Sequence, residues 1–172
     1  MNLADDDFTL FDLPPHFALD RAALDARWRA LQSEVHPDRF AADGAAAQRL
    51  AMQWSVRINE AYRRLKDPLA RATYLCELRG APIRAEDNTA MAADFLMQQM
   101  VWREALEEAG DVTAVEVLDG EVRADETRRL AAVADALDAQ GDAAAAAQQV
   151  RALMFVARFR QDIGRRLAVD EN

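Results

Sequence analysis

His36, Pro37 and Asp38 form the tripeptide with the clearest capacity for chemistry in this sequence. Proline has no backbone N–H donor and disfavours the α-helical conformation of the residue before it, so a preceding helix is predicted to end at His36. An imidazole and a carboxylate would then lie on an exposed corner. Catalysis would also need a nucleophile, a metal-ligand cluster or a second acid, and the flanking sequence supplies none. The tripeptide is therefore predicted to serve recognition.

Two amphipathic helices are predicted on either side of this corner. Asp20 is a candidate N-cap for the first helix, which runs to about Val35. The apolar residues at helical spacing in this first helix are Leu24, Trp28, Leu31 and Val35. Those in the second helix are Leu50, Trp54, Ile58, Tyr62 and Leu65. We predict an antiparallel hairpin whose helices pack through Trp28 and Trp54.

The rest of the chain is also predicted to be helical, which makes the fold all-α. Asp67 and Pro68 are typical of a helix start, and Gly80 of a helix end. The stretch from Gly80 to Asn88 is rich in breakers and charge, so residues 1–80 are predicted to form one domain and residues 81–88 a linker. Residues 89–172 are predicted to form a three-helix bundle. Its valines between 112 and 122 fit neither the helical nor the strand period, so that segment is open between helix and loop.

Composition excludes several classes of function. A net charge of −9 over 172 residues argues against nucleic-acid binding, which requires a basic face. One cysteine and two histidines cannot form an internal disulfide or a structural metal site, so no cofactor is expected. The start of the chain does not resemble a signal peptide, and no apolar run is long enough to cross a bilayer. We expect a cytoplasmic protein without a membrane partner.

The helix after the linker has more apolar surface than a single core needs. Its core stripe comprises Phe95, Trp102, Ala105 and Ala109. A second apolar surface, of Leu96, Met97, Met100 and Val101, is continued by Glu104 and Glu108. Flexible methionines with a carboxylate rim are typical of a transient protein interface. The alternative is that a central helix of the bundle buries two faces.

Four segments of the chain, taken in order, resemble the HscB family, whose members are J-type co-chaperones of iron–sulfur cluster assembly. The segments are FTLFDLP, VHPDRF, INEAYRRLKDPLARATYL and DFLMQQMVWREALEE. The resemblance covers essentially the whole chain, and a generic J-domain protein would share only VHPDRF.

The resemblance implies an L-shaped all-α protein that is not itself an enzyme. Its N-terminal J-domain would stimulate the ATPase of a specialised DnaK-type chaperone, HscA, and its C-terminal bundle would hold the scaffold protein IscU, which owns the iron–sulfur cluster. The residues implied for the chaperone contact are His36, Pro37, Asp38, Arg27, Arg29 and Arg39. Those implied for the scaffold contact are Leu96, Met97, Met100, Val101, Glu104, Glu108 and Phe155.

The sequence departs from the family pattern at two places. Glu34 and Val35 stand where J-domains usually carry a basic residue and a tyrosine, and Val101 stands where the family often has an acid. Arg27 and Arg29 could equally be ordinary solvated helix residues. The alternative functions are a J-protein that serves a general DnaK-type chaperone with another client, and a helical adaptor in which the tripeptide has no role.

Overall fold

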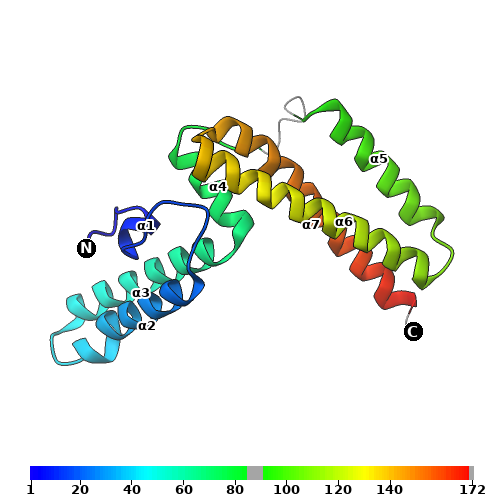
Figure 1. The fold of residues 1–172 in the computed structure, drawn as a ribbon. Helices are drawn as coiled ribbons and strands as arrows, with labels where there is room; N and C mark the ends of the chain where they lie inside the picture. Colours follow the sequence, from blue (N-terminus) through cyan, green and yellow to red (C-terminus); the bar gives the residue numbers. More distant parts are fainter. Residues whose placement is uncertain (85–90, 171–172) are drawn as a thin grey trace. The chain divides into compact units, whose positions relative to one another are not determined.

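The computed structural model describes residues 1–84 and 91–170, and every regular element within them is helical, as predicted (Figure 1). In chain order the elements are α1 (Asp7–Leu10), α2 (Arg21–Val35), the 3₁₀ turn η1 (Pro37–Phe40), α3 (Ala45–Lys66), α4 (Pro68–Leu78), α5 (Ala93–Glu108), α6 (Val112–Ala134), the π-helical turn η3 (Asp135–Gln140) and α7 (Ala143–Asp170).

The boundaries of these helices follow from local sequence. The Asp20 carboxylate accepts hydrogen bonds from the N–H groups of Ala22 and Ala23, which caps α2 as predicted. Gly44 precedes α3 with φ of 93°, and Gly80 follows α4 with φ of 80°. Both lie in the left-handed region that side chains with a Cβ rarely adopt, so glycine sets these two turns at little cost.

The chain divides into two compact units, residues 1–75 and 76–172. The first unit therefore ends within α4, five residues before the predicted domain end at residue 80. Of the predicted linker, residues 85–88 lie outside the described residues.

The side chains that follow position 75 explain where the units divide. The Cys76 thiol lies 3.8 Å from the carbonyl oxygen of Ala143, and Arg79 donates a 2.6 Å hydrogen bond to the carbonyl of Leu137. Both acceptors belong to the second unit. The end of α4 is thus tied to the C-terminal helices by contacts that local sequence does not reveal.

In the first unit, α2 and α3 form the predicted antiparallel hairpin (Figure 1). Trp28 and Trp54, through which the two helices were predicted to pack, are both partly buried and lie at different levels of the hairpin. Trp28 stacks on Tyr62 with ring centroids 4.7 Å apart, and its indole N–H donates to Asn59 at 3.0 Å. Trp54 lies at the other end of the hairpin, beside Val35. Antiparallel pairing causes this, because the middle of α2 meets the last turns of α3.

A buried ion pair fastens the start of the chain to α3. The Asp7 side chain is fully buried, and its Oδ1 lies 2.8 Å from Arg57 Nη1. The Arg57 guanidinium also donates to the carbonyl oxygens of Leu3 and Asp5, at 3.2 and 2.7 Å. A second cation, Arg64, lies 3.4 Å from Asp7 Oδ2. Arg57 and Arg64 thus both face the buried carboxylate, and Arg57 also holds the N-terminal segment.

We predict that Arg57→Met lowers the free energy of unfolding by about 3 kcal/mol, because it leaves a buried carboxylate without its closest cation. Urea denaturation of the full chain, followed by circular dichroism, measures this loss. Asp7→Asn combined with Arg57→Met should recover part of it, because no buried charge then remains. An equal loss in the single and double variants would assign the stabilisation to the two carbonyl contacts.

In the second unit, α5, α6 and α7 form the predicted three-helix bundle. A cluster of buried apolar residues in it comprises Phe95, Trp102, Ala109, Val115, Leu118, Val122, Ala152, Phe155, Val156, Phe159 and Ile163. The segment left open between helix and loop is helical. Val115, Leu118 and Val122 recur at steps of three and four and are buried, whereas Val117 is exposed and obscured the period.

Burial raises the pKa of the Cys76 thiol from 9.0 to about 11. At pH 8 only about one thiol in a thousand would then be ionised, so we predict that the native chain reacts far more slowly with a disulfide reagent than the urea-unfolded chain. Equal reaction rates for the native and the urea-unfolded chain would show that the Cys76 thiol is not buried.

The Cys76 thiol also affects the pH dependence of stability. Because the unfolded thiol loses its proton at lower pH than the folded one, this group makes the free energy of unfolding fall as pH rises from 9 towards 11.

Candidate functional site: two protein-interaction surfaces

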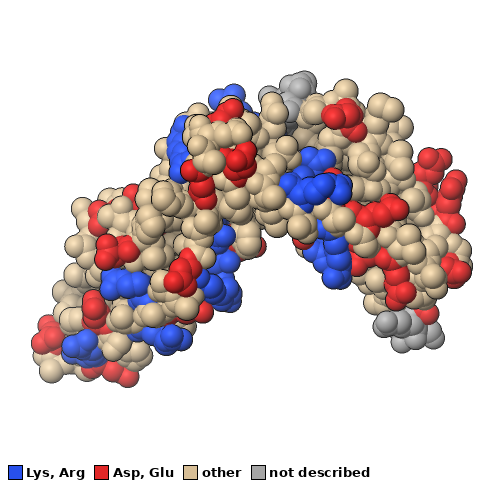
Figure 2. All heavy atoms as spheres, viewed as in Figure 1, with Lys and Arg blue, Asp and Glu red and all other residues tan. Residues whose placement is uncertain are grey.

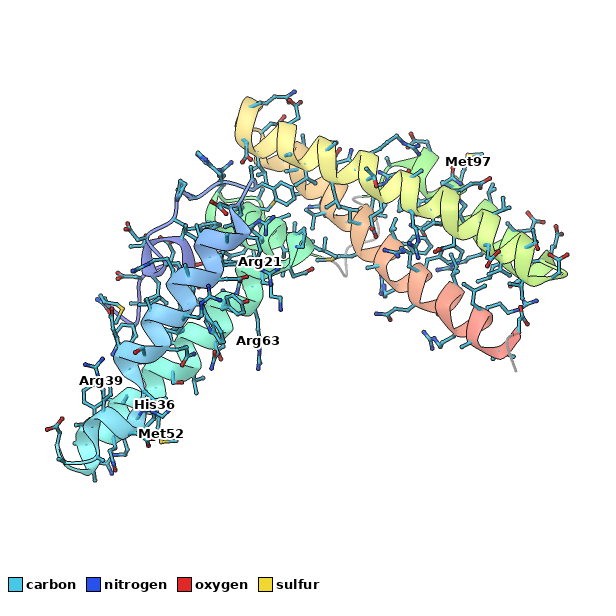
Figure 3. All side chains as sticks on the ribbon, turned by 60° about the horizontal axis from the view of Figure 1, so that its bottom comes forward. Arg21, His36, Arg39, Met52, Arg63 and Met97 are labelled. Atoms are coloured by element: carbon cyan, nitrogen blue, oxygen red, sulfur yellow. The ribbon has the colours of Figure 1, made fainter. Side chains whose placement is uncertain are left out.

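The His36–Pro37–Asp38 corner lies exposed at the end of the hairpin, where α2 stops (Figure 3). His36 has φ of −58° and ψ of 128°, the extended conformation expected before proline, and Pro37 opens η1. His36 Nδ1 accepts a hydrogen bond from the Asp38 N–H at 3.3 Å and so caps η1. The predicted end of the helix at His36 is confirmed.

The geometry of the corner assigns a role to each nitrogen of the imidazole ring. Nδ1 also lies 3.6 Å from Asp38 Oδ2, but it can donate to that oxygen only when it carries a proton, and it cannot then accept from the Asp38 N–H. We take the shorter contact, from the Asp38 N–H to Nδ1, as the hydrogen bond. The ring then carries its proton on Nε2, and Nε2–H is the donor of the ring. The side chains of His36 and Asp38 are 57% and 92% exposed, so this donor and the carboxylate are both available to a partner.

The three arginines predicted beside the corner differ in their surroundings. Arg27 is partly buried, and its Nε donates a 3.1 Å hydrogen bond to the carbonyl of Phe11. Arg39 is exposed and donates to the carbonyl of Ser33 at 3.1 Å. Arg29 is exposed on α2. Arg27 therefore holds the turn after α1 in place, and Arg29 and Arg39 are the two of the set that present charge to solvent.

The second candidate surface is an apolar patch on α5. Its members are Leu96, Met97, Met100 and Val101, whose exposed fractions are 41%, 67%, 71% and 57%. We call these four residues the α5 patch; Met97 is labelled in Figure 3. The alternative in which α5 buries two faces is wrong for this unit, because one face is buried and the other lies in solvent. A contiguous exposed apolar surface on a small protein is typical of a binding site.

Carboxylates border the α5 patch towards the end of the helix. Glu104 and Glu108 are exposed, as predicted. Glu107, which was not predicted, is also exposed. It lies three residues after Glu104, and this spacing places the two side chains next to each other on the helix surface. Figure 2 shows acidic side chains gathered where α5 ends and α6 begins. A partner of the α5 patch would therefore be favoured by basic residues at this end.

Phe155, predicted as a scaffold contact on the last helix, belongs to the core instead. Only 7% of the residue is exposed. Its ring meets Phe95 edge-on, with centroids 5.7 Å apart, and stacks on Phe159 at 5.8 Å. The Arg103 guanidinium lies 5.3 Å from the ring centroid and covers it. The reason is that α5 packs over this part of α7, so the aromatic side chain fills the space between the two helices.

We predict that Phe155→Ala destabilises the protein by about 3–5 kcal/mol, because it leaves a cavity beside the rings of Phe95 and Phe159. The solvent-exposed Met100→Ala should change the free energy of unfolding by less than about 0.5 kcal/mol. Thermal unfolding of the two variants measures both effects. Similar small losses in both variants would place Phe155 on the surface.

The described residues offer no alternative site for metal chemistry. Among residues 1–84 and 91–170, no three histidine, cysteine, aspartate or glutamate side chains come together in a group that could hold a metal ion. No helix in the same ranges is long and apolar enough to span a membrane.

Comparisons with known proteins agree with these features. Residues 91–164 match the family model described as the HSCB C-terminal oligomerisation domain. A co-chaperone protein HscB homolog of Burkholderia multivorans is 54% identical over 167 residues, which cover 95% of each chain.

Two solved structures extend the match to the fold. The crystal structure of human co-chaperone protein HscB aligns with a TM-score of 0.90 at 28% identity, covering 96% of this chain and 84% of that one. Chaperone HscB from Vibrio cholerae aligns with a TM-score of 0.86 at 40% identity, covering 93% and 96%. The resemblance read from the four sequence segments is confirmed. The chain belongs to the HscB family of co-chaperones.

Proposed function

We propose that this co-chaperone stimulates ATP hydrolysis by a specialised DnaK-type chaperone of the HscA type and delivers an IscU-type scaffold to it during iron–sulfur cluster assembly. The observation that carries the proposal is the presence of two separate exposed surfaces on one chain. The His36–Pro37–Asp38 corner lies in the first unit and the α5 patch in the second.

The chemistry of the corner supports the chaperone contact. The Asp38 carboxylate is 92% exposed, and pairing with an arginine of the chaperone would contribute roughly 1.5–3 kcal/mol. The Nε2–H donor of His36 supplies a second directed contact. Arg29 and Arg39 add positive charge nearby, whereas Arg27 would act indirectly by holding α1. Such contacts accelerate hydrolysis only if they favour the hydrolysis-competent state of the chaperone over its other states.

The α5 patch supports the scaffold contact. Met97 and Met100 are flexible and polarisable, so they adapt to a partner surface that changes during cluster assembly. Glu104, Glu107 and Glu108 would favour a partner with basic residues. Val101 is apolar where the family often has an acid, which makes the apolar share of this contact larger. In this scheme the iron–sulfur cluster belongs to the scaffold, and the protein carries no cofactor.

The test is the steady-state ATPase rate of an HscA-type chaperone with this protein, with and without an IscU-type scaffold. We expect stimulation by the protein alone and a further, synergistic increase when the scaffold is present. A general DnaK chaperone assayed in parallel should respond less, and its response should not depend on the scaffold. Equal stimulation of both chaperones, independent of the scaffold, would favour a J-protein with another client.

A further inference from the structure

The end of α5 is an unfavourable place for the acidic side chains that border the α5 patch. The last carbonyl groups of a helix have no partner within it, and they give this end a partial negative charge. Glu107 and Glu108 occupy the last turn of α5, which contains no lysine or arginine, and Glu104 lies one turn before Glu108. The carboxylates therefore repel both the helix end and one another. A cation from another element would stabilise this turn.

Arg166 of α7 supplies such a cation. Its Nη2 donates a 2.8 Å hydrogen bond to the carbonyl oxygen of Ala109, the residue that follows α5, and its Nη1 donates to the carbonyl oxygen of Leu106 at 3.5 Å. On its other side, Nε lies 3.1 Å from Asp170 Oδ2, one turn along α7. The Arg166 side chain is 35% exposed, so salt screens its charge less than that of a fully solvated arginine. One guanidinium thus fastens the last turn of α5 to α7.

Apolar contacts hold the earlier turns of α5 more firmly than its last turn. Phe95 and Trp102 are buried, and Trp102 stacks on Phe159 with ring centroids 5.9 Å apart. After Trp102 the helix adds to this cluster only the partly buried Leu106 and the small side chain of Ala109. The acidic turn therefore depends on the contacts of Arg166 for its position.

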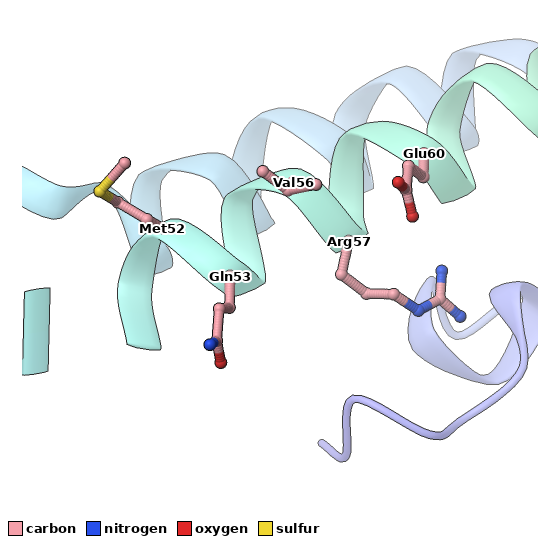
Figure 4. A pocket seen from close by; sticks show the side chains of 5 residues that line it. All are labelled: Met52, Gln53, Val56, Arg57 and Glu60. Carbon is pink, nitrogen blue, oxygen red and sulfur yellow. The ribbon is translucent and has the colours of Figure 1, made fainter. Parts of the chain in front are cut away.

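An arginine of the first unit holds a chain segment in a similar way. Figure 4 shows a groove on α3 from which the Arg57 side chain extends towards the N-terminal segment, where it donates to the carbonyl oxygens of Leu3 and Asp5. That segment carries no residue of the two candidate surfaces, so these contacts of Arg57 serve the fold. Arg166 differs, because the turn that it holds carries the carboxylates of a candidate surface.

We propose that Arg166 is a positioning residue for scaffold binding, because it fixes the acidic end of α5, with Glu104, Glu107 and Glu108, in the arrangement that a basic partner surface meets. The inference rests on the proposed function and adds to it a residue that lies outside the α5 patch.

The sign of the effect separates positioning from net charge. Removing a positive charge from this acidic end would, through charge alone, strengthen the attraction of a basic partner. Loss of Arg166 weakens scaffold binding instead, because the last turn of α5 frays and the carboxylates no longer keep their arrangement. The part of the affinity that is lost is the part that depends on salt.

The experiment measures binding of an IscU-type scaffold to the full-length protein and three variants by isothermal titration. Arg165→Met is the matched control, because Arg165 is the neighbouring residue of α7, its side chain is 74% exposed and it pairs with Asp162 of the same helix. We expect Arg166→Met to bind severalfold more weakly than wild type at physiological salt, and Arg165→Met to bind at least as tightly as wild type. Arg166→Lys should lie between Arg166→Met and wild type, because an ammonium keeps the charge without the fork of donors. At about 1 M salt, where the screening length is about 3 Å, all four affinities should converge.

Hydrogen exchange measures the positioning of α5 without any partner. The amides of residues 104–109 should exchange about tenfold faster in Arg166→Met than in wild type, whereas the buried turns of α6 and α7 keep their rates. Both measurements are made well below the unfolding temperature, which thermal unfolding gives for each variant. A loss of global stability alone would then leave the scaffold affinity unchanged.

Four results would overturn the proposal. They are scaffold binding by Arg166→Met that is as tight as wild type or tighter, an equal loss of affinity in Arg165→Met, a loss that persists undiminished at about 1 M salt, and unchanged exchange at the end of α5. If Arg166→Met does not fold, Arg166→Lys decides by the same criteria. Failure of the proposed function is distinguishable, because wild type itself would then not bind the scaffold.

Discussion

Replacing His36 by glutamine is expected to reduce stimulation of the chaperone ATPase to the basal rate while leaving the fold intact. Glutamine can neither reproduce the ring geometry that caps η1 through Nδ1 nor present the Nε2–H donor in the same direction. The side chain is 57% exposed and fills no core space, so the free energy of unfolding should change by less than about 0.5 kcal/mol. Steady-state ATPase rates and thermal unfolding measure the two quantities separately.

The sequence provides a matched control for this variant. His16 is the other histidine of the chain and is also exposed, but it lies between α1 and α2, away from the corner. His16→Gln should stimulate the chaperone like wild type. If His36→Gln retains stimulation, or if it loses stimulation together with several degrees of thermal stability, the corner does not act as a recognition element.

Replacing Leu96, Met97 and Met100 together by serine is expected to weaken scaffold binding by 100-fold or more. Each of these residues is at least 41% exposed, and burying one against a partner contributes roughly 1 kcal/mol or more. Because the changes lie in the second unit, stimulation of the chaperone without scaffold should equal that of wild type. Isothermal titration with an IscU-type scaffold gives the affinity, and ATPase rates with and without scaffold give the functional consequence.

Val117→Ser combined with Val169→Ser is the matched control for the α5 patch. Both valines are at least 60% exposed in the same unit but lie on α6 and α7. This variant should bind the scaffold with wild-type affinity. Undiminished binding by the α5 patch variant would place the scaffold elsewhere, and a loss of helicity in that variant would show that its side chains support the fold.

The corner was predictable from the sequence because its geometry is local. Pro37 restricts His36 to an extended conformation whatever the rest of the chain does, and Asp20 caps α2 through neighbouring N–H groups. In α5 the spacing of Phe95 and Trp102 identifies the buried face, but the predicted core residue Ala105 is exposed, and the sequence left open whether Met97 and Met100 would be buried as well. Short-range sterics and helical period suffice for such features.

Other features were decided by contacts between distant segments, which the spacing of residues along one helix cannot specify. Phe155 is buried because α5 packs against α7, and Arg27 is partly buried because the carbonyl of Phe11 lies within reach of its guanidinium. Trp54 lies beside Val35, and Trp28 stacks on Tyr62, because the antiparallel register of the hairpin sets these neighbours. The sequence by itself determined the helices, the exposed corner and the apolar surplus on α5. Only the tertiary structure decided which of these side chains remain available to a partner, because burial depends on packing between elements that are far apart in the chain.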